Sequence, residues 1–271
     1  MPRIIFWSPE SSMTGNTHAI LAVTTLMGIN HKAKSLLMQG HFNSRKIETS
    51  FTPYDELKSS GVFENSDIGI GALTKIVVSN KLTAATIKNY AKPVLKDRLD
   101  VLYGINSSEK EQYTLMAHNL QFITRKAAEI YDLVFVDLPK QTNEEYVKQT
   151  LMDSEVIVCT VNQDSVKLEE FFTSVQKNEL LKDKSIIYVI GDYENKSKYN
   201  LRNIKTKYGI KDTIYAIPHN YAFVDACNDG SIIDFFYKNM NADKTDYNGE
   251  FIVEVSKIVE KIIEESKIKD F

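Results

Sequence analysis

A short segment of small and polar residues, Ser8 to His18, has the residue types best suited to binding chemistry. It reads SPESSMTGNTH and lies between an apolar run and an amphipathic stretch that starts at Thr17. A strand, a small-residue loop and a helix start in this order are typical of a phosphate-binding loop, where backbone N–H groups and the helix N-terminus face the anion. The segment contains no lysine, so it lacks the cation that normally contacts the transferred phosphates.

The elements that would position this loop are short apolar runs alternating with amphipathic stretches. The runs are nearly uniformly apolar and do not alternate between apolar and polar residues, which predicts strands covered on both faces. Three of the intervening stretches, Thr17 to Met27, Glu109 to Ile130 and Ser165 to Gln176, have helical periodicity. The pattern predicts an α/β fold with a mostly parallel, seven- or eight-stranded sheet and helices on both faces. The predicted strands are Arg3 to Ser8, Ala33 to Met38, Leu99 to Tyr103, Leu133 to Asp137, Val156 to Val161, Ser185 to Ile190 and Thr213 to Ile217.

Composition favours one domain, residues 1–271, in a reducing cytoplasmic compartment. The chain is 43% hydrophobic and has no linker-like tract, so one large core is the simplest expectation. Its two cysteines are far apart, which argues against a disulfide scaffold or a zinc motif. No apolar run approaches the roughly 20 residues that cross a bilayer. The interval Phe42 to Asp97 is expected to be an elaborated crossover with short helical runs, Ile70 to Val78 and Thr83 to Tyr90.

The loop and the order of the elements resemble the ParA/MinD-like family of P-loop ATPases with a deviant Walker A motif, and within it the atypical TadZ/CpaE-like members with a degenerate loop. Gly15-Asn16-Thr17 matches the family's final Gly-Lys-Thr if one residue is inserted upstream. On this match Asn16 replaces the lysine that contacts the phosphates, and Thr17 keeps the hydroxyl that ligates Mg²⁺. Glu10 stands where the family has its signature lysine.

Other segments extend the resemblance along the chain. Leu133 to Pro139 resembles the Walker B strand with Asp137 beside Mg²⁺, and Leu99 to Gly104 resembles the segment that precedes it. Gln39 stands at or next to the position of the family's water-orienting aspartate. The ends of two later strands, at Asp192 and Pro218, resemble the adenine site.

The resemblance implies ATP and Mg²⁺ as cofactors, with hydrolysis absent or very slow because the loop lysines are missing. Thr17 and Asp137 would hold Mg²⁺ through the nucleotide. The implied nucleotide-binding residues are Glu10, Ser11, Ser12, Met13, Thr14, Gly15, Asn16, Thr17, His18, Asp137, Asp192 and Pro218.

Simpler interpretations stay open for each of these features. The loop could be an ordinary strand-to-helix turn with Asn16 or Thr17 as the helix cap. Asp137 could be a carboxylate that only caps a loop. His18 and His41 could lie near one site, although their spacing is not that of a metal motif. A slow ATPase with its lysine supplied from elsewhere, such as Lys140, is a further alternative.

The resemblance also implies partners. A homodimer is expected, acting as a localisation or partitioning factor for a pilus, secretion or mobile-element apparatus. A basic cluster suits nonspecific contact with DNA phosphates, although it could be a solvated face. The C-terminal amphipathic stretch, Ile252 to Ile263, has a mixed-charge polar side and is expected to pack on the domain, without stable membrane insertion. The rival function is an interaction scaffold that binds no nucleotide. The basic cluster comprises Lys196, Lys198, Arg202, Lys205 and Lys207.

Overall fold

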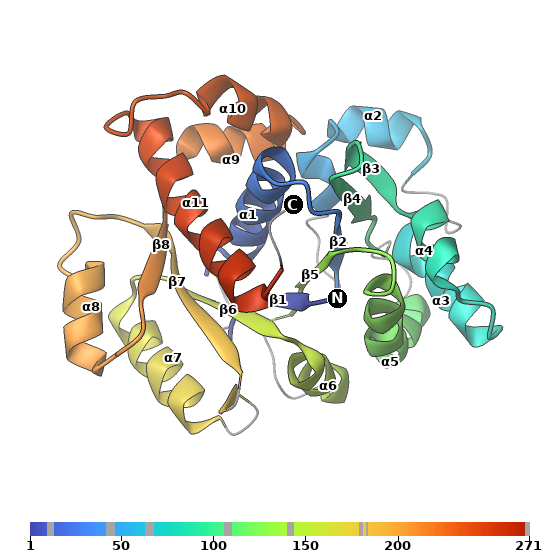
Figure 1. Cartoon of the computed structure of the whole chain (residues 1–271), viewed down its shortest axis with the longest axis horizontal. Helices are drawn as coiled ribbons and strands as arrows, with labels where there is room; N and C mark the ends of the chain where they lie inside the picture. Colours follow the sequence, from blue (N-terminus) through green and yellow to red (C-terminus); the bar gives the residue numbers. More distant parts are fainter. Residues whose placement is uncertain are drawn as a thin grey trace.

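Eight strands form one sheet in the order β3-β4-β2-β5-β1-β6-β7-β8 in the computed structural model (Figure 1). The structure describes residues 1–9, 14–41, 47–62, 68–105, 110–139, 144–178, 181–182 and 184–268. All pairings are parallel except that of β3 with β4. The prediction of a mostly parallel sheet is therefore confirmed. The strands are β1 (Arg3–Trp7), β2 (Ser35–Gln39), β3 (Lys92–Leu95), β4 (Leu99–Leu102), β5 (Leu133–Asp137), β6 (Val156–Val161), β7 (Ser185–Tyr193) and β8 (Ile214–Pro218).

Helices cover both faces of the sheet, as its apolar strands require. One face packs against α1, α9, α10 and α11, and the other against α3 to α8 (Figure 1). The helices are α1 (Asn16–Asn30), α2 (Tyr54–Ser59), α3 (Gly69–Val78), α4 (Ala84–Tyr90), α5 (Lys110–Ala127), α6 (Glu145–Asp153), α7 (Ser165–Lys177), α8 (Leu201–Tyr208), α9 (Tyr221–Asn228), α10 (Ile232–Asn239) and α11 (Tyr247–Ser266), with a 3₁₀ turn η1 (Ile47–Ser50).

Two differences from the predicted strands have physical causes. The sequence prediction missed β3, whose Lys92 and Pro93 are exposed; proline is tolerated there because β3 is an antiparallel edge strand. Strand β7 continues to Tyr193, three residues beyond its predicted end, across a register irregularity at which Asp192 has a φ of +52°. This extension brings β7 to the loop before α1.

Helix α11 packs against the sheet and the neighbouring helices, as expected for the C-terminal stretch. Val255, Ile258 and Ile262 are fully buried on its inner side. Phe251 lies 4.7 Å from Phe223 of α9 and 5.9 Å from Phe235 of α10, measured between ring centroids. The apolar side of α11 is therefore part of the hydrophobic core. No described helix combines the length and hydrophobicity that a membrane span requires.

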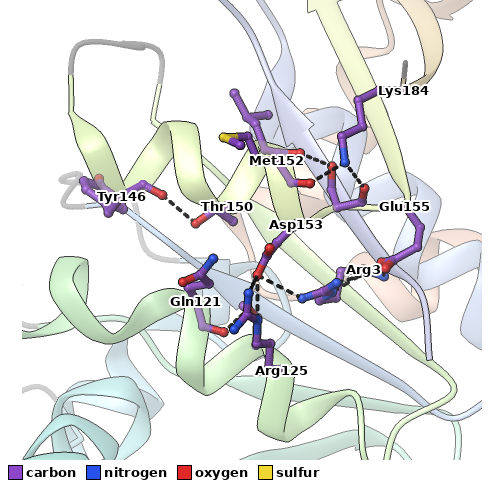
Figure 2. A network of polar contacts seen from close by, with 12 residues as sticks. Arg3, Gln121, Arg125, Tyr146, Thr150, Met152, Asp153, Glu155 and Lys184 are labelled. Atoms are coloured by element: carbon purple, nitrogen blue, oxygen red, sulfur yellow. Dashed lines mark hydrogen bonds and ion pairs between the residues drawn. The ribbon is translucent and has the colours of Figure 1, made fainter. Parts of the chain in front are cut away.

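An ion-pair network ties the amino end of β1 to α5 and α6 (Figure 2). Asp153 accepts hydrogen bonds from Arg125 Nε at 2.7 Å and from Arg3 Nη1 at 3.4 Å, and Arg3 also pairs with Glu155 at 2.9 Å. Lys184 donates to the carbonyl oxygens of Met152 and Ser154. These contacts fasten the edge of the sheet opposite the loop before α1.

Asp153→Asn should lower the free energy of unfolding by only about 0.2 to 1 kcal/mol, because the Arg125 side chain is 56% exposed. Urea denaturation at low salt measures the loss, and added salt should shrink it by screening the wild-type pairs. Glu260→Gln is the control, since Glu260 makes no ion pair within the described ranges. A loss of several kcal/mol would contradict this weak coupling.

Candidate functional site

The loop before α1 lies at the carboxyl edge of the sheet, beside its central strand. Strand β1 pairs with β5 on one side and with β6 on the other. Trp7 ends β1 and Asp137 ends β5, and Cys159 of β6 lies in register with Trp7, so the three residues lie near the same edge of the sheet. In open α/β sheets ligands bind at this edge. Of the implied binding segment, residues 14–18 are described, whereas Glu10, Ser11, Ser12 and Met13 lie outside the described residues.

Gly15 is the residue from which α1 begins. It is the N-cap, with a φ of +74° and a ψ of 9°, and no side chain caps the helix. The alternative in which Asn16 or Thr17 is the cap is therefore wrong, because both side chains are engaged elsewhere. A left-handed conformation at this position favours glycine, which has no Cβ to clash with the backbone.

The loop packs directly on β7 through Gly191. A Cβ added to Gly191 would lie 2.3 Å from the backbone oxygen of Thr14 and 3.3 Å from the Cα of Gly15. Only a residue without a side chain permits this approach. The position of the loop is thus set by backbone contact with the extended part of β7.

The Asn16 side chain is directed into the edge of the sheet and is only 6% exposed. Its Nδ2 donates to the backbone oxygen of Phe6 at 3.1 Å and to Asp137 Oδ1 at 2.7 Å. Its Oδ1 accepts a hydrogen bond from Thr160 Oγ1 at 2.9 Å. The Asn16 amide therefore ties β1, β5 and β6 together beneath the loop.

Asp137, at the end of β5, is the acceptor around which the site is built. Oδ1 accepts from Asn16, and Oδ2 accepts from Thr17 Oγ1 at 2.9 Å. His41 Nε2 lies 3.2 Å from Oδ2, and Asp137 is 1% exposed. Two of its partners are thus side chains in the first turn of α1. A hydroxyl and a carboxylate in contact are hard oxygen ligands of the kind that Mg²⁺ prefers, so these two residues fit the ion.

Two side chains at the end of β2 line the same edge. Gln39 pairs in register with Asp137, and its Nε2 lies 3.3 Å from His41 Nε2. His18 instead makes an edge-on contact with the Phe223 ring, at 6.1 Å between centroids. The two histidines thus have different surroundings. Within the described ranges, no group of three or more His, Cys, Asp or Glu residues is placed to hold a metal.

Sequence reasoning missed two polar residues at this edge. Thr160 was part of a strand interpreted as apolar, yet its hydroxyl bonds to Asn16 and lies 3.5 Å from Thr14 Oγ1. Glu48, in η1, is 1% exposed and accepts from the Gly104 backbone N–H at 3.4 Å. A Cβ on Gly104 would lie 3.0 Å from Gln39 Oε1, so Glu48 adds a carboxylate near the end of β2. For Thr160, the available signal was a polar residue within an otherwise apolar strand. For Glu48, the sequence contained no signal.

Asp192 and Pro218 lie at the carboxyl ends of neighbouring strands, next to the loop. Asp192 follows Gly191, and its Oδ1 lies 2.6 Å from His219 Nδ1. Pro218 pairs with Tyr193 across β7 and β8. The structure therefore brings residues 14–17, Asp137, Asp192 and Pro218 to one edge, in two groups that meet at Gly191.

The sheet order, the strand–loop–helix unit and the Thr17–Asp137 contact define a P-loop type of α/β fold. No family model matches the chain, and no curated protein sequence matches it. Solved structures do match. A ParA family ATPase from Chlorobium tepidum TLS has a TM-score of 0.69 at 12% identity, over 93% of this chain and 96% of that one.

Two further matches were solved with nucleotide. The septum site-determining protein MinD of Pyrococcus horikoshii OT3, in complex with Mg-ADP, gives a TM-score of 0.68 at 14% identity, over 99% of this chain and 100% of that one. A putative plasmid partition protein of Borrelia burgdorferi B31, bound to AMPPNP, gives a TM-score of 0.64 at 17% identity, over 99% of this chain and 100% of that one. The chain therefore has the fold of the MinD and ParA ATPases.

Proposed function

We propose that this chain binds ATP and Mg²⁺ at the N-terminus of α1 and acts as a nucleotide-dependent partitioning or localisation factor with little or no hydrolysis. The observation that carries the proposal is the contact of Thr17 Oγ1 with Asp137 Oδ2 at 2.9 Å, beside a neutral Asn16. Backbone N–H groups at the start of α1 would face the phosphates, and Thr17 and Asp137 would hold the ion. Mg²⁺ would neutralise phosphate charge that the loop cannot neutralise itself.

Slow chemistry follows from the charges of the site. Phosphoryl transfer depends on positioning and on cations that stabilise charge in the transition state. Asn16 supplies none, and Gln39 supplies no carboxylate to orient water. Dimerisation on nucleotide binding, rather than turnover, would then carry the signal. Adenine would lie near Asp192 and Pro218.

The apparatus is proposed on resemblance alone: a pilus, secretion or mobile-element system in the cytoplasm, served by a homodimer. Nonspecific DNA contact is part of the same proposal. Helix α8 and the segment before it carry Lys198, Arg202 and Lys205. Lys207 instead pairs with Glu169 at 3.3 Å, so it is less available to phosphate than the others.

A scaffold that binds no nucleotide is the second candidate, and a specific observation favours it. The Asn16 amide uses both of its polar atoms within the protein, and Asp137 accepts on both oxygens. A site satisfied in this way has less to gain from a ligand. The two candidates differ in whether the chain binds nucleotide at all.

The purified chain should hydrolyse ATP at or near background while its apparent mass rises with ATP and Mg²⁺. Competent enzymes turn over at about 1 per second or faster, and this chain lacks the charges for that rate. Phosphate release and light scattering after gel filtration measure the two properties. Turnover near 1 per second would contradict slow chemistry, and a constant mass would contradict the dimerisation switch.

A further inference from the structure

A groove of about 980 Å³ lies at the edge of the sheet opposite the candidate nucleotide site. It is formed by the amino ends of β7 and β8, the C-terminal end of α7 and the last turns of α11, which meet at this end of the sheet (Figure 1). Ile186, Tyr188 and Tyr215 contribute half-buried apolar surface to its lining. A cavity of this size accommodates several side chains of a ligand.

Lysines dominate the charged lining of the groove. Lys177, Lys182 and Lys211 are exposed, and none of them pairs with a carboxylate anywhere in the described part of the chain. They come from three separate segments: the end of α7, the connection to β7 and the turn before β8. The described lining has five lysines and three carboxylates, and this excess of positive charge favours an anionic partner.

Two other lysines of the groove have partners within the protein. Lys184 donates to the carbonyl oxygens that end α6 (Figure 2), and Lys261 pairs with Glu264 at 2.9 Å and also with Glu265. Glu265 further accepts from Ser185 Oγ at 2.7 Å. Lys261 is thus balanced by carboxylates of its own helix, and the charge of Lys184 is held against the end of α6. The exposed lysines of the groove with no carboxylate partner among the described residues are Lys177, Lys182 and Lys211.

We propose that this groove binds an acidic peptide segment of a partner protein, with its carboxylates on Lys177, Lys182 and Lys211 and an apolar side chain on Ile186 and Tyr188, which share one face of the sheet. The wall also carries Asp212 and Glu264. Discrete negative charges separated by apolar residues can avoid these carboxylates, whereas a duplex nucleic acid or an anionic bilayer presents an unbroken negative surface. The concave shape likewise suits a single extended chain better than a flat or convex surface.

A fluorescein-labelled peptide of alternating glutamate and phenylalanine is the probe, followed by fluorescence anisotropy without nucleotide. Lys177→Gln, Lys182→Gln and Lys211→Gln should each weaken its binding about two- to fivefold, and the triple variant roughly tenfold or more. Added salt should weaken binding to the wild type and have less effect on the triple variant. All three side chains are exposed, so folding should be preserved, which circular dichroism checks.

Two controls distinguish binding in the groove from general electrostatic attraction between the peptide and the protein. Lys88→Gln, on α4 at the other end of the sheet, should leave binding unchanged, and a peptide with glutamine in place of glutamate should bind at least tenfold more weakly. The proposal is overturned if the acidic peptide does not bind at low salt, or if the triple variant binds it as the wild type does. It is also overturned if duplex DNA or phosphatidylserine vesicles bind through the same lysines more tightly than the peptide.

Discussion

Gly191→Ala is expected to destabilise the chain and to remove nucleotide binding together. The new Cβ would lie 2.3 Å from the backbone oxygen of Thr14, a rigid neighbour, so the loop before α1 must move. Forcing an atom into packed structure costs about 1 to 3 kcal/mol. Because Gly15 and the N-terminus of α1 move with the loop, ATP affinity should fall at least tenfold. Urea denaturation and calorimetric titration with ATP measure the two effects.

Gly209→Ala is the matched control for this variant. Gly209 has open space around its Cβ position, so the change costs only the strain of its left-handed backbone, a φ of +61°. We expect a loss of about 1 kcal/mol in the free energy of unfolding, with ATP affinity unchanged. Equal effects of the two substitutions on ATP binding would contradict the role of Gly191 in positioning the loop.

Asn16→Lys is expected to tighten ATP binding roughly tenfold to a hundredfold. A charge-assisted contact between an ammonium and phosphate contributes about 1.5 to 3 kcal/mol. The ligand-free protein should meanwhile lose about 1 to 3 kcal/mol of stability, because the contacts of Asn16 with Phe6 and Thr160 disappear. Hydrolysis should stay near background, since Gln39 is unchanged.

Asn16→Met separates the added charge from the lost amide. Methionine is unbranched and similar in length to lysine, but it carries no charge, so it should lose stability without gaining affinity. If Asn16→Lys binds ATP no more tightly than the wild type, the loop is closed to phosphate. The scaffold would then be the better of the two proposed functions.

The fold was largely predictable because its signal is repeated along the chain. Each central strand, such as β5 or β6, is a nearly uniform apolar run, and such runs specify strands buried on both faces. The edge strand β3 could not be predicted, because Pro93 and the short length of the strand remove that signal. The extension of β7 past Gly191 depends on contact with a loop far away in sequence.

The candidate site was predictable in location and less so in chemistry. The sequence identified Asn16, Thr17 and Asp137, and the structure brings them into direct contact. It did not indicate that Asn16 turns inward to Thr160, because the choice between facing solvent and facing the sheet depends on partners from other strands. Glu48 lies in a segment without clear periodicity, so its burial at this edge had no local signal.

Calorimetric titration of the purified chain with ATP, with and without Mg²⁺, tests most directly whether the Thr17–Asp137 pair forms a nucleotide site. We expect saturable binding that requires Mg²⁺, since the ion must offset the absent lysine charge. Asp137→Asn is the matched variant, because it keeps the shape of the side chain and removes the charge that holds the ion; its binding should be at least tenfold weaker. Absence of ATP binding to the wild type in the presence of Mg²⁺, or equal binding by wild type and Asp137→Asn, would contradict the proposed site.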